Sequence, residues 1–172
     1  MKIVLNLLLI SSALYAQSSQ AWWYFSANTI PPITEEASVE ERSHNTWLKN
    51  HFSKQHQQLI PVVLVADTFF ICNQVRKTDE NRYKLSFLID NMHKDTLAEK
   101  LSRCLGEETM QSDVALNFGL LGCFHAQLAH LPKADREQKM ILVKQAILSL
   151  SYDERRKSLT QCVTEQSIHY LK

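Results

Sequence analysis

Four cysteines, Cys72, Cys104, Cys123 and Cys162, are the residues of this chain best suited to do chemistry. No CxxC motif is present, whereas the usual thiol oxidoreductases and many closed zinc sites carry one. An even number of cysteines in an exported chain is typical of structural disulfides. The cysteine content therefore predicts that all four thiols are oxidised.

The positions of the cysteines within predicted helices favour one pairing among the three that four cysteines allow. Cys123 and Cys162 each lie about three turns into a predicted helix, and the helix between them carries no cysteine. An up-down-up connection then makes their helices parallel and brings both sulfurs to mid-height. Cys72 and Cys104 each lie near the C-terminal end of a helical segment. We therefore predict the disulfides Cys72–Cys104 and Cys123–Cys162.

Gly119 and Gly122 lie beside Cys123 in the same predicted helix. A glycine inside a helix costs about 1 kcal/mol relative to alanine, so two of them indicate a packing reason. A disulfide between helices needs a closer approach than helices usually make. The glycines therefore support close packing of the helix that carries Cys123.

Weaker candidates for chemistry have simpler structural interpretations. Asp67 interrupts an apolar run, and its pKa would rise if it were buried. Cys123, His125 and His130 are the alternative zinc ligands, but their spacing is not that of a closed zinc site. The basic run 155–157 is interpreted as a solvated helix face. No GxSxG, phosphate-binding loop or HExxH motif is present, so we predict neither a catalytic residue, a metal site nor a cofactor.

The first 21 residues have the pattern of a signal peptide. Lys2 supplies a positive charge, residues 3–10 are largely apolar, and small or polar residues lead to cleavage points after Ala16 or Ala21. The apolar run is shorter than the roughly 20 residues that a spanning helix needs. The sequence therefore predicts export and a periplasmic or secreted location, with an uncleaved membrane anchor as the alternative.

Residues 22–45 are predicted to form a flexible arm. The arm begins with the aromatic cluster Trp22, Trp23, Tyr24 and Phe25 and continues through a segment that is rich in glutamate and poor in large apolar residues. Aromatic side chains often anchor interfaces, so the cluster is a candidate partner-binding element. Packing against the folded domain and contact with a membrane are the two alternatives.

Residues 46–172 are predicted to form one all-α domain, a disulfide-stabilised bundle of five or six helices. Three glycines and four prolines are too few for the turns of a sandwich or barrel. Segment 62–75 is apolar and β-branched, so a buried helix is expected and a buried strand is the alternative. The segment 112–130 is apolar nearly all round and should be central, and Phe118→Ala should cost about 3–5 kcal/mol if Phe118 is fully buried. Helical periodicity and end signals place the remaining helices at 46–59, 83–92, 96–105, around 140–150, and 151–171.

The balance of charge excludes one class of partner. The chain of 172 residues has 19 basic and 18 acidic residues, so it lacks the basic excess of a nucleic-acid-binding protein. The fold class resembles small helical proteins that bacteria export to bind another protein, including neutralisers of secreted toxins. We therefore expect non-catalytic binding of another exported or envelope protein. The alternatives are a structural subunit of a cell-envelope assembly and a hydrolase with an unrecognised site.

Overall fold

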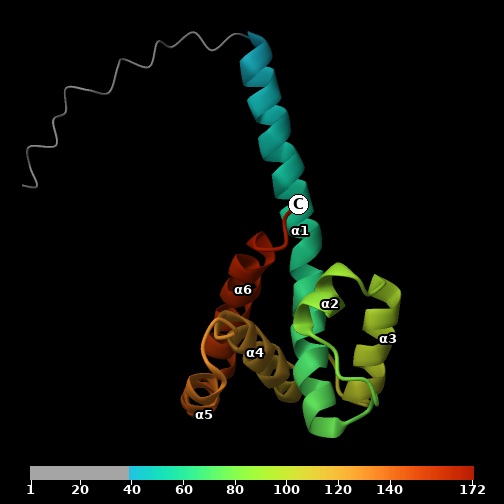
Figure 1. Ribbon diagram of the computed structural model, residues 1–172, viewed down its shortest axis with the longest axis vertical. Coiled ribbons are helices and arrows are strands. Elements are labelled where there is room, and N and C mark those ends of the chain that lie inside the picture. The colour runs from blue at the N-terminus through green and yellow to red at the C-terminus, as the bar shows by residue number, and fades with distance from the viewer. Residues whose placement is uncertain (1–38) are drawn as a thin grey trace, which may run out of the picture. The chain divides into compact units, whose positions relative to one another are not determined.

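The computed structural model describes residues 39–172, and these residues form helices and no strand. The chain divides into two units, Met1–Ser43 and His44–Lys172. The prediction of an all-α domain with five or six helices is confirmed. In chain order (Figure 1) the helices are α1 (Val39–Arg76), α2 (Leu85–Asp90), α3 (Lys94–Leu105), α4 (Asp113–Gln127), α5 (Lys133–Ser149) and α6 (Tyr152–Ile168).

Helix α1 is longer than the sequence predicts. Two helical segments, 46–59 and 62–75, were expected to be separate, but they form one continuous helix with Pro61 inside it. The helix also begins at Val39, so residues 39–45 of the predicted arm are helical. Proline removes one helical hydrogen bond, and its ring crowds the preceding turn. Burial of the apolar residues that follow Pro61 offsets this cost. The expectation that segment 62–75 is helical is confirmed.

Among residues 39–172, α1 is the one helix whose length and composition would allow it to cross a membrane. Within the bundle, 44% of its apolar stretch is already buried. The same helix carries the carboxyl group of Asp67 and the disulfide-bonded Cys72 at fully buried positions. The packing of α1 in the bundle therefore accounts for part of its apolar composition.

Helix α4 occupies the centre of the bundle, as predicted. Every residue from Val114 to Ala126 is buried or partly buried, and α4 packs closely against α5 and α6. Gly119 faces α6 and α1, whereas Gly122 lies against the backbone of α1 at Asp67. Phe118 does not meet the condition of full burial on which its predicted cost of truncation depends. Its ring is only partly buried because it lies at the rim of the core, where the guanidinium group of Arg76 stacks 5.7 Å from the ring centre.

Both predicted disulfides are present. Cys72–Cys104 joins α1 to α3, and Cys123–Cys162 joins α4 to α6, with Cα atoms 6.1 and 6.2 Å apart. No cysteine is free. Disulfides persist in oxidising surroundings, so the two bonds indicate a compartment outside the reducing cytoplasm.

The predicted helix ends are largely confirmed. The hydroxyl of Ser112 accepts a hydrogen bond from the Ala115 backbone at the start of α4. Ser151 and Glu154 form a complete capping box before α6. Gly106 ends α3 with a positive φ of 65°. Local sequence signals therefore set most boundaries of the helices that follow α1.

Candidate binding surface

The N-terminal half of α1 stands clear of the other helices in the unit His44–Lys172 (Figure 1). From His44 to Lys54 every residue is exposed except Leu48, which is partly buried. Trp47 is 58% exposed and Phe52 44% exposed. We call residues 44–59 the exposed half of α1. It presents large aromatic groups to solvent without a packing partner from the bundle.

Ring contacts organise the side chains along the exposed half of α1. Trp47 stacks between His44 and His51, with ring centres 6.2 and 5.1 Å away. The ring of His51 also meets the edge of Phe52 at 6.0 Å. The two stacking contacts of Trp47 follow from spacings of three and four residues, which place side chains side by side on a helix, whereas His51 and Phe52 are adjacent in the sequence. The four rings therefore form a single aromatic patch.

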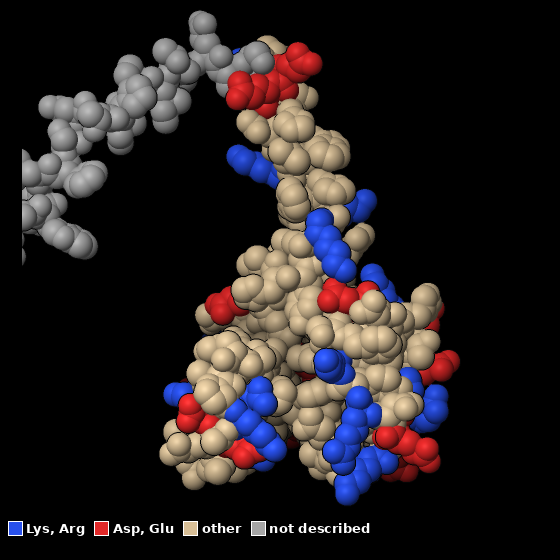
Figure 2. Space-filling model, viewed as in Figure 1, with Lys and Arg blue, Asp and Glu red and all other residues tan. Residues whose placement is uncertain are grey.

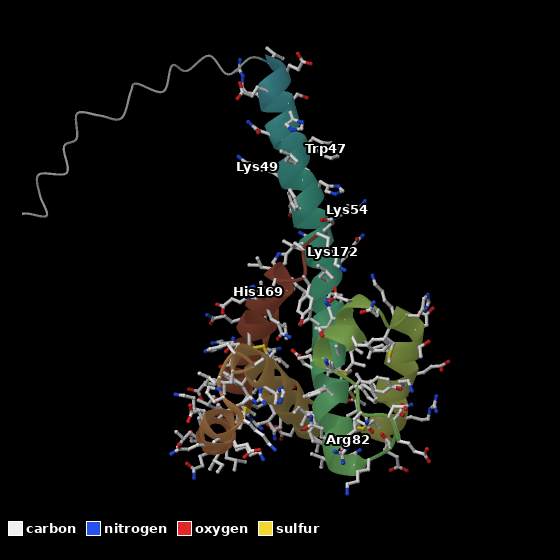
Figure 3. All side chains as sticks on the ribbon, viewed as in Figure 1. Trp47, Lys49, Lys54, Arg82, His169 and Lys172 are labelled. Atoms are coloured by element: carbon white, nitrogen blue, oxygen red, sulfur yellow. A yellow bond between two sulfur atoms is a disulfide. The ribbon has the colours of Figure 1, made fainter. Side chains whose placement is uncertain are left out.

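The exposed half of α1 carries positive charge and no carboxylate. No Asp or Glu occurs between His44 and Ala66, whereas Lys49 and Lys54 project from this stretch (Figure 3). On the face drawn in Figure 2, lysine side chains flank the stretch, and acidic groups gather at the helix start and on the bundle. An acidic surface would complement this segment electrostatically.

A small pocket of about 250 Å³ lies where the exposed half of α1 enters the bundle. Gln55 and Leu59 of α1 line one side, and Asp90, Tyr170 and Lys172 line the other. Lys172 pairs with Asp90 at 3.1 Å. The side-chain oxygen of Gln55 is buried and accepts no hydrogen bond. The pocket therefore marks the point where the bundle begins to cover α1.

A larger groove of about 690 Å³ lies beyond the C-terminal end of α1. Phe69, Phe70 and Leu88 form its apolar side, and the loop 77–83 forms its polar rim. Lys77 lines this groove and adopts a left-handed backbone, with a φ of 54°.

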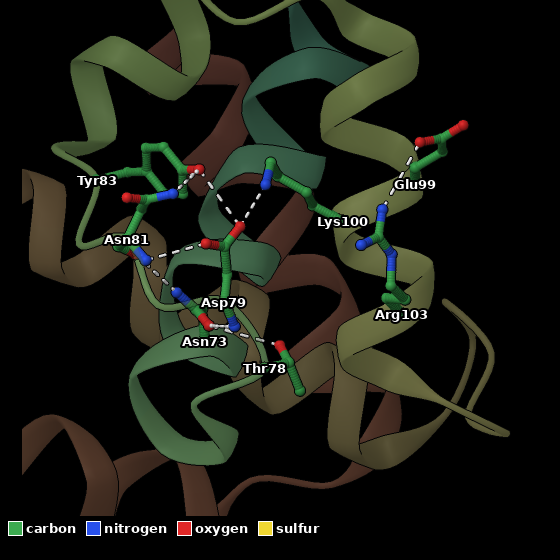
Figure 4. Close-up of polar contacts among 8 residues, drawn as sticks. All are labelled: Asn73, Thr78, Asp79, Asn81, Tyr83, Glu99, Lys100 and Arg103. Carbon is green, nitrogen blue, oxygen red and sulfur yellow. Dashed lines mark hydrogen bonds and ion pairs between the residues drawn. The ribbon is translucent and has the colours of Figure 1, made fainter.

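Hydrogen bonds hold the loop beside this groove (Figure 4). The side chain of Asn73 accepts the backbone N–H of Asp79 at 2.8 Å and donates to the carbonyl of Asn81 at 3.2 Å. Asp79 also accepts from Lys100 and Tyr83. The hydrogen bond from Lys100 is the main reason that the pKa of Asp79 falls below its usual value. Because these groups satisfy one another, the network explains the structure of the loop without a ligand.

Asp67 is fully buried and lines neither cavity. One carboxyl oxygen accepts a hydrogen bond from Gln166 at 3.1 Å, and the other has no partner. Burial raises the pKa of Asp67 to about 8, and the Gln166 hydrogen bond opposes that shift. Its environment therefore favours the neutral acid as a core group.

The histidines considered in the sequence lie apart from any metal-binding cluster. The sulfur of Cys123 is bonded to that of Cys162, so it is not a zinc ligand. His125 packs on Phe70 with ring centres 4.9 Å apart, and burial lowers the pKa of His125. His130 contacts the carbonyl of Gln127 at 2.8 Å. Within residues 39–172, no three side chains of the usual metal-binding types are grouped.

The interpretation of run 155–157 as a solvated face is wrong for Arg155. Its side chain is only 13% exposed, donates to Asn117 at 2.6 Å and pairs with Asp113. Arg155 therefore joins α6 to α4. Arg156 and Lys157 are exposed, as expected.

The predicted aromatic cluster Trp22, Trp23, Tyr24 and Phe25 lies outside the described residues. Trp47 and Phe52 are apolar residues of the segment 46–59 that was predicted to be helical, and both are exposed. The absence of carboxylates between His44 and Ala66 was the signal that could have marked this helix as unusual.

No protein-family model, curated protein or solved structure matches this chain. Function is therefore inferred from the described residues themselves. Among them, the exposed half of α1 is the feature that the stability of the bundle does not explain.

Proposed function

We propose that this chain is an exported, periplasmic or secreted, non-catalytic domain that binds another exported or envelope protein through the exposed half of α1. The observation that carries the proposal is the exposure of Trp47 and Phe52 on a stretch of α1, residues 44–54, in which Leu48 is the one residue that is partly buried. The two disulfides support a location outside the cytoplasm.

The energetics of an isolated helix support a role in binding. Helices of one or two dozen residues are marginal in water unless an apolar face is packed. The last turn of the exposed half of α1 contacts the bundle, where His56 lies 2.9 Å from the carbonyl oxygen of Thr164 in α6, but residues 44–54 are exposed except for Leu48. A partner that covers Trp47 and Phe52 would stabilise the helix and gain the burial energy that aromatic anchors provide at interfaces.

The described residues give less support to a hydrolase. Asp67 has the most strongly raised carboxyl pKa among them, yet it is buried against Gln166 and lines neither cavity. General acid catalysis requires the acid to reach its substrate within hydrogen-bonding distance. Protein binding through an exposed surface needs no such group.

Site-specific photo-cross-linking in the exporting cell tests the proposal. A photo-reactive residue replaces Phe52 in one variant and Phe87 of α2 in a control variant, because both side chains are 44% exposed. We expect one exported protein to cross-link from position 52 and not from position 87. The purified partner should then bind the full chain with one-to-one stoichiometry, and Phe52→Ala should weaken that binding by about tenfold or more.

Two results would contradict this proposal. Cross-links from position 52 to lipid alone would show that the exposed half of α1 lies on a membrane. Equal cross-linking of the same proteins from positions 52 and 87 would show that the contacts are not specific to α1.

A further inference from the structure

The exposed half of α1 continues a helical seam that the bundle itself uses. Leu48, Phe52, Gln55 and Leu59 are separated by four, three and four residues, the alternation of the two core positions of a coiled-coil heptad. The same alternation continues into the bundle as Val62, Ala66 and Phe69, which are buried. We call Leu48, Phe52, Gln55 and Leu59 the open seam.

The open seam lacks the covering that its continuation has. Leu48 and Leu59 are partly buried, whereas Phe52 is 44% exposed. Gln55 has a buried side-chain oxygen without a hydrogen-bond donor. Another helix laid along the seam would cover Leu48 and Phe52, the apolar groups farthest from the bundle. Continuity with the buried seam therefore identifies a helix as the occupant that fits.

The residues that flank the open seam indicate the charge of that helix. In the heptad frame, the flanking positions hold His44, Lys49, His51, His56 and Gln58, with no acidic residue among them. Flanking positions of paired helices select partners by charge, and like charges disfavour pairing. A second copy of this chain would place no acidic group opposite Lys49, so charge does not favour self-pairing. A helix with acidic flanking positions is favoured.

We propose that the open seam binds an acidic amphipathic helix of the partner protein. This inference rests on the proposed function and specifies its partner. Phe52 is the central apolar anchor, and Lys49 pairs with a carboxylate on the bound helix. The pocket lined by Gln55 and Leu59 accepts the end of that helix nearest the bundle.

Two synthetic peptides of about three heptads test the proposal with the full chain. Both have leucine at the core positions. One has glutamate at every flanking position and the other lysine, so each repels its own copies and resists self-pairing. Binding is measured by isothermal titration calorimetry at low and high salt. We expect the glutamate peptide to bind, the lysine peptide not to bind, and salt to weaken the complex.

Matched variants identify the surface that binds the peptide. Phe52→Ala should weaken binding of the glutamate peptide by about tenfold or more, whereas Phe87→Ala, an equally exposed phenylalanine on α2, should leave it unchanged. Lys49→Glu should weaken binding of the glutamate peptide and strengthen that of the lysine peptide. Lys54→Glu, at a heptad position away from the open seam, should have a smaller effect on both.

Several outcomes would overturn the inference. Binding of neither peptide, equal binding of both, or binding that survives Phe52→Ala would each show that the open seam does not select an acidic helix. Sedimentation that finds a dimer lost in Phe52→Ala would assign the seam to a second copy of this chain. Binding to phosphatidylglycerol vesicles that requires Phe52, without peptide binding, would assign it to an anionic membrane.

Failure of this inference is separable from failure of the proposed function. If position 52 cross-links to an exported protein and neither peptide binds, the acidic-helix inference is wrong and protein binding stands. If position 52 cross-links to no protein, the proposed function is wrong and the inference falls with it.

Discussion

Gly122 lies where α4 comes closest to α1, and replacing it with alanine is expected to destabilise the domain. A β-carbon built on Gly122 would lie 2.7 Å from both the Cα and the carbonyl carbon of Asp67. Favourable contacts between carbon atoms occur at about 3.5–4.0 Å. The obstacle is backbone rather than a flexible side chain, so one of the two helices must move by roughly 1 Å.

Two opposing effects set the size of the change at Gly122. Replacing a helical glycine with alanine ordinarily stabilises a helix by about 1 kcal/mol. Overpacking a core costs typically 1–3 kcal/mol and sometimes more, and a clash with backbone belongs at the upper end. The expected net loss is therefore about 2–3 kcal/mol in the free energy of unfolding. The melting temperature should fall by roughly 10 °C.

Gly119 supplies the matched control within the same helix. A β-carbon there would lie 3.1 Å from side-chain atoms of Leu159 and Thr68, and these side chains can shift slightly. Gly119→Ala should therefore stay within about 1 kcal/mol of the parent chain, because the helix preference for alanine offsets the crowding.

Guanidinium unfolding followed by far-ultraviolet circular dichroism, with both disulfides intact, measures all three chains. A Gly122→Ala variant as stable as the parent chain, or more stable, would refute the close contact between α4 and Asp67. Equal losses in both glycine variants would show that crowding is not specific to the backbone of α1.

Three further predictions concern the core. Burial raises the pKa of Asp67 to about 8. Between about pH 4 and 8 the native state therefore keeps a proton that the unfolded chain has lost. The free energy of unfolding should fall across this range by up to about 1.4 kcal/mol per pH unit. Unfolding measured across this range should lose that slope in Asp67→Asn, and an unchanged slope would assign the titration to another group. Reduction should remove about 4 kcal/mol for each disulfide, because their cysteines lie 32 and 39 residues apart, and a thermal melt with reductant should show a much lower midpoint. Leu120→Ala should cost about 2–5 kcal/mol because Leu120 is 1% exposed. Phe118→Ala should cost less than the roughly 3–5 kcal/mol of a fully buried phenylalanine because Phe118 is partly buried, and a loss at the upper end of that range in denaturant unfolding would contradict this packing.

The sequence predicted the later helices well because their signals are local. The end signals act within one helical turn, as at Ser112, Gly106 and the Ser151 capping box, so they can be recognised in the sequence without knowledge of the fold. The signal at Pro61 misled because proline ordinarily begins or breaks a helix. Packing of the apolar residues after Pro61 keeps α1 continuous, and such packing depends on helices that are distant in the sequence.

The sequence by itself determined the helical class, most helix ends and both disulfides, since periodicity, capping and cysteine depth are properties of single segments. Tertiary structure alone decided which apolar groups are covered. Phe52 and Phe69 share the heptad alternation of α1, yet Phe69 is 1% exposed and Phe52 is 44% exposed. The tertiary structure also decided that Asp67 is buried against Gln166, which lies 99 residues further along the chain. Burial is set by long-range neighbours, so identical local patterns gave a core residue in one half of α1 and a candidate binding residue in the other.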